Sequence, residues 1–358
     1  MSETSGPDGP AEVPPGIDPE RVAAFFSRHV PGANAPVSFR LLAGGRSNLT
    51  YRVDIASSPP RSFVLRRPPL GHVLPTAHDM VREHRVLAAL AATKVPVARP
   101  VALCEDTAVL GAPFYVMEYR PGVVIEREIP VGYAESSDAR RRLSLALVDT
   151  LVALHAVDSE RVGLADFGRP AGYLERQVRR WSTQWERSKT RELPEVNHLA
   201  KLLLERLPRS PAPTLVHGDY RLGNLALDPA DPGRVIAVFD WEMATLGDPL
   251  ADLGYTLIYW GEAADAPHLR PPGSHQAVTA RPGFLDRSEI VAEYAKRSGR
   301  DVSEIDFYQV LALFKLAVIT EGIHARFLMG KTVGEGFDAI GRQVAVLCER
   351  AIALTASW

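Results

Sequence analysis

Two carboxylates and one carboxamide on neighbouring apolar segments are the residues of this sequence best suited to chemistry. Asp219 and Asn224 lie in the run His-Gly-Asp-Tyr-Arg-Leu-Gly-Asn, residues 217–224, and short apolar segments flank this run on both sides. Asp240 follows directly after a further apolar segment, 235–239. Polar residues that follow buried strands lie in loops held by a rigid scaffold, where they can face a ligand.

These residue types fit the transfer of a phosphoryl group to a hydroxyl. Asp219 can orient an attacking hydroxyl and accept its proton, so it is the predicted catalytic residue. The oxygens of Asn224 and Asp240 are hard donors of the kind that Mg²⁺ prefers, so these two are the predicted metal ligands. Taken alone, residues 217–224 are equally compatible with a capped surface turn, and Asp240 with an ordinary acid at a strand end.

A glycine-containing turn earlier in the chain can bind the phosphates of a nucleotide. The residues assigned to this turn are Gly45, Arg46, Ser47 and Asn48. Successive backbone N–H groups in such a turn form a concave site for anions. An ordinary hairpin turn between two strands is the alternative.

The elements around these motifs predict an α+β protein with two lobes. Residues 1–16 are rich in Pro and Gly and are expected to form a disordered tail. Residues 17–120 form a small β-rich N-lobe that binds the nucleotide, with a long helix expected to begin at Thr76. Residues 121–358 form a larger, mostly helical C-lobe with the catalytic loop, the metal site and the acceptor site. The strands expected in the N-lobe are 37–42, 50–55, 62–67, 101–110 with a turn inside it, and 114–119.

Composition excludes several other classes of protein. The formal net charge of −2 lacks the basic excess that is typical of nucleic-acid binders. No apolar run approaches the roughly 20 residues that span a bilayer, and the N-terminus has no signal-peptide pattern. The two cysteines, Cys104 and Cys348, have no metal-ligand spacing, so a cytoplasmic location is expected. The oligomeric state stays open.

Five stretches, in this order, resemble the aminoglycoside phosphotransferase and choline-kinase superfamily, whose members have a protein-kinase-like fold. They are similar above all to the branch related to the kinase-like domain fused to acyl-CoA dehydrogenases. The stretches are residues 44–51, 63–69, 82–87, 217–224 and 239–253. The resemblance implies an ATP- and Mg²⁺-dependent kinase that transfers the γ-phosphate to a small-molecule hydroxyl. It leaves the choice between ATP and GTP open.

The resemblance also implies nucleotide-binding residues in the N-lobe. The third strand should carry a cation for the α- and β-phosphates, and this chain has Arg66 where many relatives have Lys. Glu83 interrupts an apolar helix face, so it is the expected partner of Arg66. Adenine should bind the backbone of the hinge at Glu118, Tyr119 and Arg120.

Three polar residues near the motifs are assigned supporting roles. The resemblance implies that His217 braces the loop through backbone carbonyls rather than acting as a base. Asp248 is expected to cap a helix whose first turn contains Pro249. Asp252 is expected to point back and brace the catalytic loop.

The acceptor is the least determined part. The C-lobe helices around Trp181, Trp185, Glu321, His324 and Arg326 mix cations and aromatics with acids, which favours a neutral or anionic acceptor, such as a hydroxyacyl thioester. Two rival hypotheses remain. One is a nucleotide-binding pseudokinase or scaffold without turnover, which the Arg66 substitution favours. The other is a protein kinase, although no activation segment is visible after Asp240.

Overall fold

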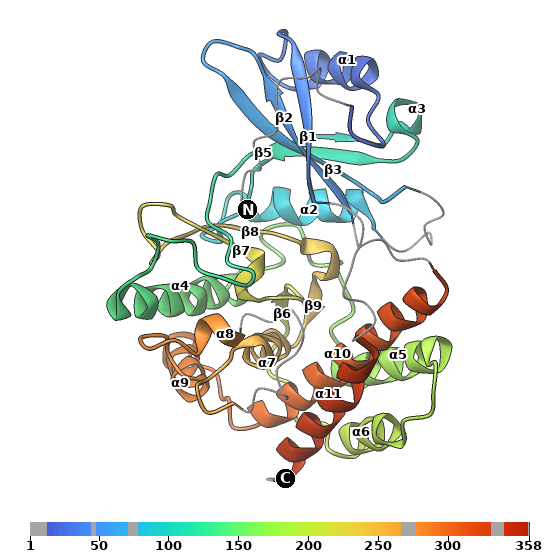
Figure 1. Cartoon of the computed structure of the whole chain (residues 1–358), viewed down its shortest axis with the longest axis vertical. Helices are drawn as coiled ribbons and strands as arrows, with labels where there is room; N and C mark the ends of the chain where they lie inside the picture. The colour runs from blue at the N-terminus through green and yellow to red at the C-terminus, as the bar shows by residue number, and fades with distance from the viewer. Residues whose placement is uncertain (1–12, 44–47, 71–77, 266–275, 331–339, 357) are drawn as a thin grey trace. The chain divides into compact units, whose positions relative to one another are not determined.

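A computed structural model describes residues 13–43, 48–70, 78–265, 276–330, 340–356 and 358 (Figure 1). The chain divides into two compact units, Met1–Pro121 and Gly122–Trp358. The first is dominated by an antiparallel sheet and the second by helices, which confirms the predicted α+β class. Within the described part of the chain, no helix is both long and apolar enough to cross a membrane.

The first unit is a five-stranded antiparallel sheet with strand order β1-β2-β3-β5-β4. Its strands are β1 (Val37–Ala43), β2 (Leu49–Ile55), β3 (Arg61–Arg67), β4 (Pro100–Cys104) and β5 (Phe114–Glu118). Its helices are α1 (Pro19–His29), α2 (Met80–Leu90) and α3 (Thr107–Leu110). Tyr51, Val53 and Ile55 alternate along the buried face of β2 and pack with Phe26 of α1 in one core.

Local polar residues decide where the first unit's helices begin. Asp18 caps α1, accepting the backbone N–H of Arg21. Helix α2 begins at Met80 because Asp79 caps it; the expected start at Thr76 lies outside the described residues. The strand expected over 101–110, with a turn inside it, is wrong in its second half. Asp106 accepts the N–H of Ala108 there and starts the short helix α3.

The N-terminal tail is ordered over a part that was expected to be disordered. Residues 13–16 are described, and residues 1–12 lie outside the described part. Pro15 O accepts the hydroxyl of Tyr51 at 2.5 Å, and Gly16 O accepts Nη1 of Arg67 at 2.6 Å. These long-range bonds hold the segment against strands β2 and β3.

The second unit combines long helices with two short antiparallel strand pairs. The helices are α4 (Ser137–His155), α5 (Tyr173–Ser188), α6 (Pro194–Glu205), α7 (Pro249–Tyr259), α8 (Gln276–Thr279), α9 (Arg287–Ser298), α10 (Ile305–Leu328) and α11 (Ile340–Thr355). The strand pairs are β6 (Thr214–Val216) with β9 (Thr245–Gly247) and β7 (Leu225–Leu227) with β8 (Val235–Val238). Helix α10 packs against α5, α6, α7 and α11, and α10 and α11 lie side by side in Figure 1.

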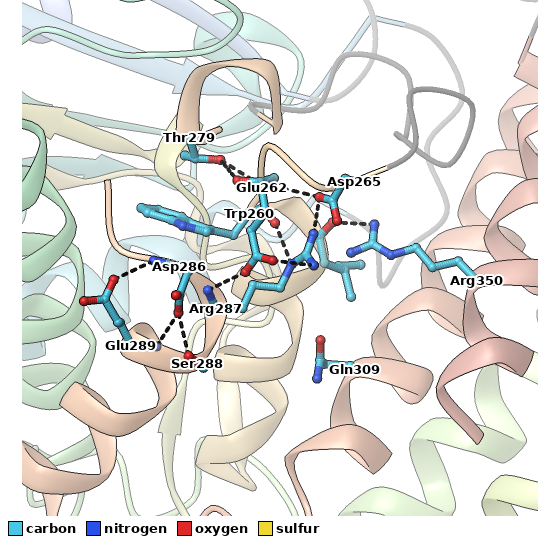
Figure 2. A network of polar contacts seen from close by, with 12 residues as sticks. Trp260, Glu262, Asp265, Thr279, Asp286, Arg287, Ser288, Glu289, Gln309 and Arg350 are labelled. Carbon is cyan, nitrogen blue, oxygen red and sulfur yellow. Dashed lines mark hydrogen bonds and ion pairs between the residues drawn. The ribbon is translucent and has the colours of Figure 1, made fainter. Parts of the chain in front are cut away.

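A polar network fixes the C-terminal end of α7 (Figure 2). Arg287, at the start of α9, donates through Nε to the carbonyl of Trp260 at 2.8 Å and forms an ion pair with Asp265. Arg350 of α11 donates to the carbonyl of Ile258 at 3.0 Å, and burial lowers the pKa of this arginine to about 10. The network matters for the site because Asp252, near the opposite end of α7, binds the backbone of His217 and Gly218.

Candidate active site

The loop between β6 and the 3₁₀ turn η1 (Leu222–Asn224) is held by the first turn of α7. Asp252 accepts the backbone N–H of His217 through Oδ2 at 2.6 Å and that of Gly218 through Oδ1 at 2.7 Å. Asp248 accepts the N–H of Leu250 and caps α7. Both supporting roles predicted for these acids are thereby confirmed.

Asp252 is a buried carboxylate held in its charged form. Burial acts to raise its pKa, but hydrogen bonds from His155 and from the backbone of His217 outweigh burial and lower the pKa. His155 contacts Asp252 Oδ2 through Nε2 at 3.3 Å and the hydroxyl of Tyr294 through Nδ1 at 2.8 Å. Burial lowers the pKa of His155, although Asp252 acts in the opposite direction. The loop therefore rests on a chain of buried polar groups that reaches α4 and α9.

His217 stabilises the loop from inside, as the sequence predicted. Its ring is fully buried, and Nε2 lies 2.8 Å from the carbonyl of Phe239. The backbone N–H of Asp219 points to Nδ1 at 3.2 Å. Nδ1 therefore accepts and Nε2 donates, so both ring nitrogens are committed to the backbone and neither is placed to act as a base.

Asp219 and Asn224 lie in direct contact. The amide nitrogen of Asn224 donates to the carbonyl and to Oδ2 of Asp219, both at 2.8 Å. Since the amide protons go to Asp219, the amide oxygen is the remaining acceptor of Asn224. Arg221 Nε lies 3.5 Å from Oδ2 of Asp219. The predicted catalytic carboxylate is thus oriented by one amide and one guanidinium.

The β7–β8 pair brings Asn224 and Asp240 to one end of a hairpin. Leu225 pairs with Val238, and the backbone N–H of Phe239 donates to the carbonyl of Asn224 at 2.8 Å. Asp240, just beyond, has the left-handed backbone angles φ 65 and ψ 63. A residue other than glycine in this conformation costs about 1 kcal/mol or more, and such strain concentrates at functional sites.

The donor set at this end of the hairpin fits magnesium. Among the described residues, no group of three or more His, Cys, Asp or Glu side chains could hold a metal. Mg²⁺ needs no such group, because it is usually bound by one or two carboxylates together with water and substrate phosphates. One amide oxygen, from Asn224, and one carboxylate, from Asp240, match that pattern.

In the first unit, the carboxylate of Glu83 contacts Arg66, Asn48 and Tyr115. Its carboxylate is 2% exposed and lies 2.9 Å from Nε of Arg66, which forms the predicted ion pair. Asn48 donates to Oε1 of Glu83 at 2.8 Å and Tyr115 to Oε2 at 3.0 Å. The last two contacts were not predicted. The side chain of Asn48, which the sequence placed in the phosphate-binding turn, is directed to Glu83.

The structure describes the predicted hinge residues 118–120 but not three residues of the predicted phosphate-binding turn. Gly45, Arg46 and Ser47 lie outside the described residues. At the hinge, the N–H of Glu118 donates to Arg99 O at 2.9 Å and that of Tyr119 to Ser62 O at 3.4 Å. Arg120 is therefore the hinge residue left as a candidate backbone donor, and its guanidinium forms an ion pair with Glu118 at 2.8 Å.

The neighbouring Arg67 is committed elsewhere. It is buried, and its guanidinium donates to the carbonyls of Gly16 and Pro68. Burial lowers the pKa of Arg67, and the contact with Tyr51 only partly offsets this. Arg66 is thus the better candidate of the two for binding phosphate.

On the acceptor side, one expectation is wrong and one residue was missed. Glu321 is fully buried and accepts the N–H and hydroxyl of Thr190, both at 2.7 Å, with Arg191 3.2 Å away. Since these partners occupy its carboxylate, Glu321 braces a loop and is not available to an acceptor. Sequence reasoning also missed Lys315 of α10, which lies above the ring of Tyr255. The available signal was its position as a lysine within an apolar helix.

Comparisons with known proteins, by sequence and by fold, both find phosphotransferases. A family described as "Phosphotransferase enzyme family" matches residues 38–285. Acyl-CoA dehydrogenase family member 10 of Mus musculus is 34% identical over 320 residues, which cover 89% of this chain. The match spans only 29% of that mouse protein.

Solved structures share the fold. A candidate aminoglycoside phosphotransferase from Ralstonia eutropha is 32% identical, with a TM-score of 0.79, and the match covers 95% of this chain and 99% of that one. The aminoglycoside phosphotransferase APH(4)-Ia, in complex with AMP-PNP and hygromycin B, is 15% identical, with a TM-score of 0.61 over 94% of this chain and 99% of that one. The predicted kinase-like fold is thereby confirmed.

Proposed function

The chain belongs to the phosphotransferase enzyme family, and from this we propose that it transfers the γ-phosphoryl group of ATP to a hydroxyl of a small molecule, with Mg²⁺. The observation that carries this proposal is the arrangement of Asp219, Asn224 and Asp240. An amide orients a carboxylate, and a second carboxylate lies at the same hairpin end as the amide. Catalysis of phosphoryl transfer is mostly positioning and charge stabilisation, and this arrangement supplies both.

In the proposed reaction, Asp219 accepts the proton of the acceptor hydroxyl and aims its oxygen at the γ-phosphorus. Asn224 and Arg221 hold the Asp219 carboxylate in place for this step. The oxygens of Asn224 and Asp240 would hold Mg²⁺, which when bound neutralises charge on the phosphates. The strained backbone of Asp240 supports a functional role for its carboxylate.

The nucleotide is assigned to residues of the first unit. Arg66 would bind phosphate oxygens through its guanidinium, which Glu83 holds in place. The backbone of Gly45, Arg46, Ser47 and Asn48 would cover the phosphates, and that of Glu118, Tyr119 and Arg120 would contact adenine. The ATP analogue named with APH(4)-Ia supports a nucleoside triphosphate as the donor, and GTP is to be tested beside ATP.

For the acceptor, we propose a neutral or anionic alcohol rather than a polycation. Arg221 and Lys315 bring two cations into the surroundings of Asp219, and both charges act on that carboxylate. An aminoglycoside would meet repulsion from these cations. Because the mouse relative is named for an acyl-CoA dehydrogenase, hydroxyacyl thioesters are the first acceptors to test.

A nucleotide-binding protein without turnover is the second candidate. The observation that favours it is Arg66 in place of lysine in the third strand. Both candidates predict ATP binding, so only ADP release separates them.

The test has two steps. Thermal unfolding is followed with ATP and Mg²⁺, ATP alone, GTP and Mg²⁺, and no ligand. At about 100 times the dissociation constant, a bound nucleotide stabilises the fold by about 2.7 kcal/mol. Purified protein is then assayed for ADP release with hydroxyacyl-CoA esters, free hydroxy acids and aminoglycosides. Absence of any nucleotide shift contradicts both candidates, and binding without ADP release contradicts the first.

A further inference from the structure

We propose that Lys315 is a positioning residue of the catalytic loop, whose ammonium group fixes the peptide unit that precedes Asp219. The inference rests on the proposed phosphotransfer function, in which the aim of Asp219 determines the rate. Nζ of Lys315 donates to the carbonyl of Gly218 at 2.5 Å.

Lys315 is an unusual residue in its surroundings. Helix α10 is buried along most of its length, including Phe314 and Leu316 on either side of the lysine. A lysine in such a helix normally extends its ammonium to water. Here the ammonium lies instead 4.3 Å from the ring centre of Tyr255 and 5.8 Å from that of Trp181. Aromatic faces attract a desolvated cation, so the group is held at a defined point.

The peptide bonded by Lys315 is the one that sets the direction of Asp219. The N–H of Gly218 goes to Asp252, its carbonyl to Lys315, and the N–H of Asp219 to His217. The anchors from Asp252 and His217 come from the β6–α7 part of the chain. Lys315 comes from α10 and ties the loop to the buried centre of the helical unit. A misplacement of about 1 Å in a catalytic group can cost about 100-fold in rate, so this tie has kinetic weight.

A purely structural role does not account for a cation at this point. Burial lowers the pKa of Lys315, the charges of Asp219 and Asp252 act in the opposite direction, and Arg180 adds to the lowering. Replacing a buried charge by an apolar residue of similar volume is often neutral or stabilising. Packing alone would therefore favour Met or Leu in α10. What only the ammonium supplies is the bond to the Gly218 carbonyl.

The first experiment measures the loop directly and needs no substrate. Hydrogen exchange is compared among the parent, Lys315→Met and Lys315→Arg, with Lys201→Met as the matched control on the exposed face of α6. Lys315→Met should speed exchange in the peptide covering residues 217–224 by about 10-fold or more, because a charge-assisted bond is lost. Peptides from β2 and β3 should not change. The exchange rate over residues 217–224 in Lys315→Arg should stay closer to that of the parent.

The second experiment measures rate against binding, with water as the acceptor. Release of ADP from ATP in Lys315→Met should fall about 10-fold or more, while the Kd for ATP with Mg²⁺ stays within about twofold of the parent. Should Lys315→Met fail to fold, Lys315→Gln takes its place in both experiments.

The exchange and rate measurements test the role of Lys315 separately from the proposed phosphotransfer function. Unchanged exchange over 217–224 in folded Lys315→Met or Lys315→Gln overturns the positioning role, whatever the rate does. An equal loss of ATP affinity and rate also overturns it. If the parent itself releases no ADP with any acceptor, the proposed function fails, and the exchange result still decides whether Lys315 holds the loop.

Discussion

The carboxylate of Asp252 accepts the backbone N–H of His217 at 2.6 Å, although 34 other residues separate the two in the chain. The same carboxylate contacts Nε2 of His155 and also accepts the backbone N–H of Gly218. A side chain on α7 therefore sets the backbone path that leads to Asp219.

Removal of the Asp252 carboxylate should destabilise the second unit. Asp252→Ala leaves two buried backbone N–H groups and a buried imidazole without their acceptor, which should cost about 3–5 kcal/mol. Urea unfolding measures this loss. Asp138→Ala, on the exposed first turn of α4, is the control and should change stability by less than about 1 kcal/mol. Equal losses in the two variants would contradict the bracing role.

Stability should also fall on acidification through His155. Because the pKa of His155 is lowered in the folded state, the unfolded chain binds a proton below the ordinary value of 6.5 that the folded chain does not bind. The contribution of neutral His155 to the free energy of unfolding is therefore complete above pH 6.5 and declines as the pH falls below it. His155→Gln should be less stable at pH 7.5 but show a flatter decline towards pH 5 in urea unfolding. Parallel curves for parent and His155→Gln would disprove the assignment.

The two carboxylates of the proposed catalytic site should respond differently to substitution. Asp219→Asn removes the proton acceptor, so turnover should fall by about 100-fold or more while ATP binding stays near the parental value. Asp240→Ala removes a proposed metal ligand and should weaken binding of ATP with Mg²⁺ itself. ADP release and nucleotide titration with and without Mg²⁺ distinguish these effects. Parental turnover in Asp219→Asn would show that the loop is not catalytic.

The adjacent arginines of β3 offer a matched pair for the nucleotide side. Arg66→Ala should weaken ATP binding, whereas Arg66→Lys should retain much of it because the positive charge remains. Arg67→Ala should instead lower the free energy of unfolding, since its guanidinium holds Gly16 and Pro68. Titration with ATP and urea unfolding are both needed. Undiminished binding in Arg66→Ala would place the phosphate-binding cation elsewhere.

Sequence reasoning succeeded where one residue conflicts with its local pattern. Glu83 could be paired with Arg66 because a charge in an apolar helix stripe requires a partner. Asp248 and Pro249 predicted the start of α7 by local chemistry alone.

It failed where a contact depends on strand register or on distant packing. The sequence around Glu83 does not indicate that Asn48 and Tyr115 contact it, because these contacts follow from the pairing of β2, β3 and β5. Glu321 was assigned to the acceptor side because its loop partners, Thr190 and Arg191, lie far away in sequence. The bond from Lys315 to Gly218 was missed for the same reason.

Gly218 has one further consequence. Its backbone has φ +82, and a Cβ at this position would lie 2.7 Å from the carbonyl oxygen of Met243. Protein kinases carry an arginine at the corresponding point of their His-Arg-Asp motif, and ordering of a kinase activation loop by phosphorylation relies on arginine pairs. The close contact with Met243 prevents this chain from adopting that residue. An arginine at position 218 is therefore sterically closed to this chain as an anchor for a phosphorylated segment beside the aspartate.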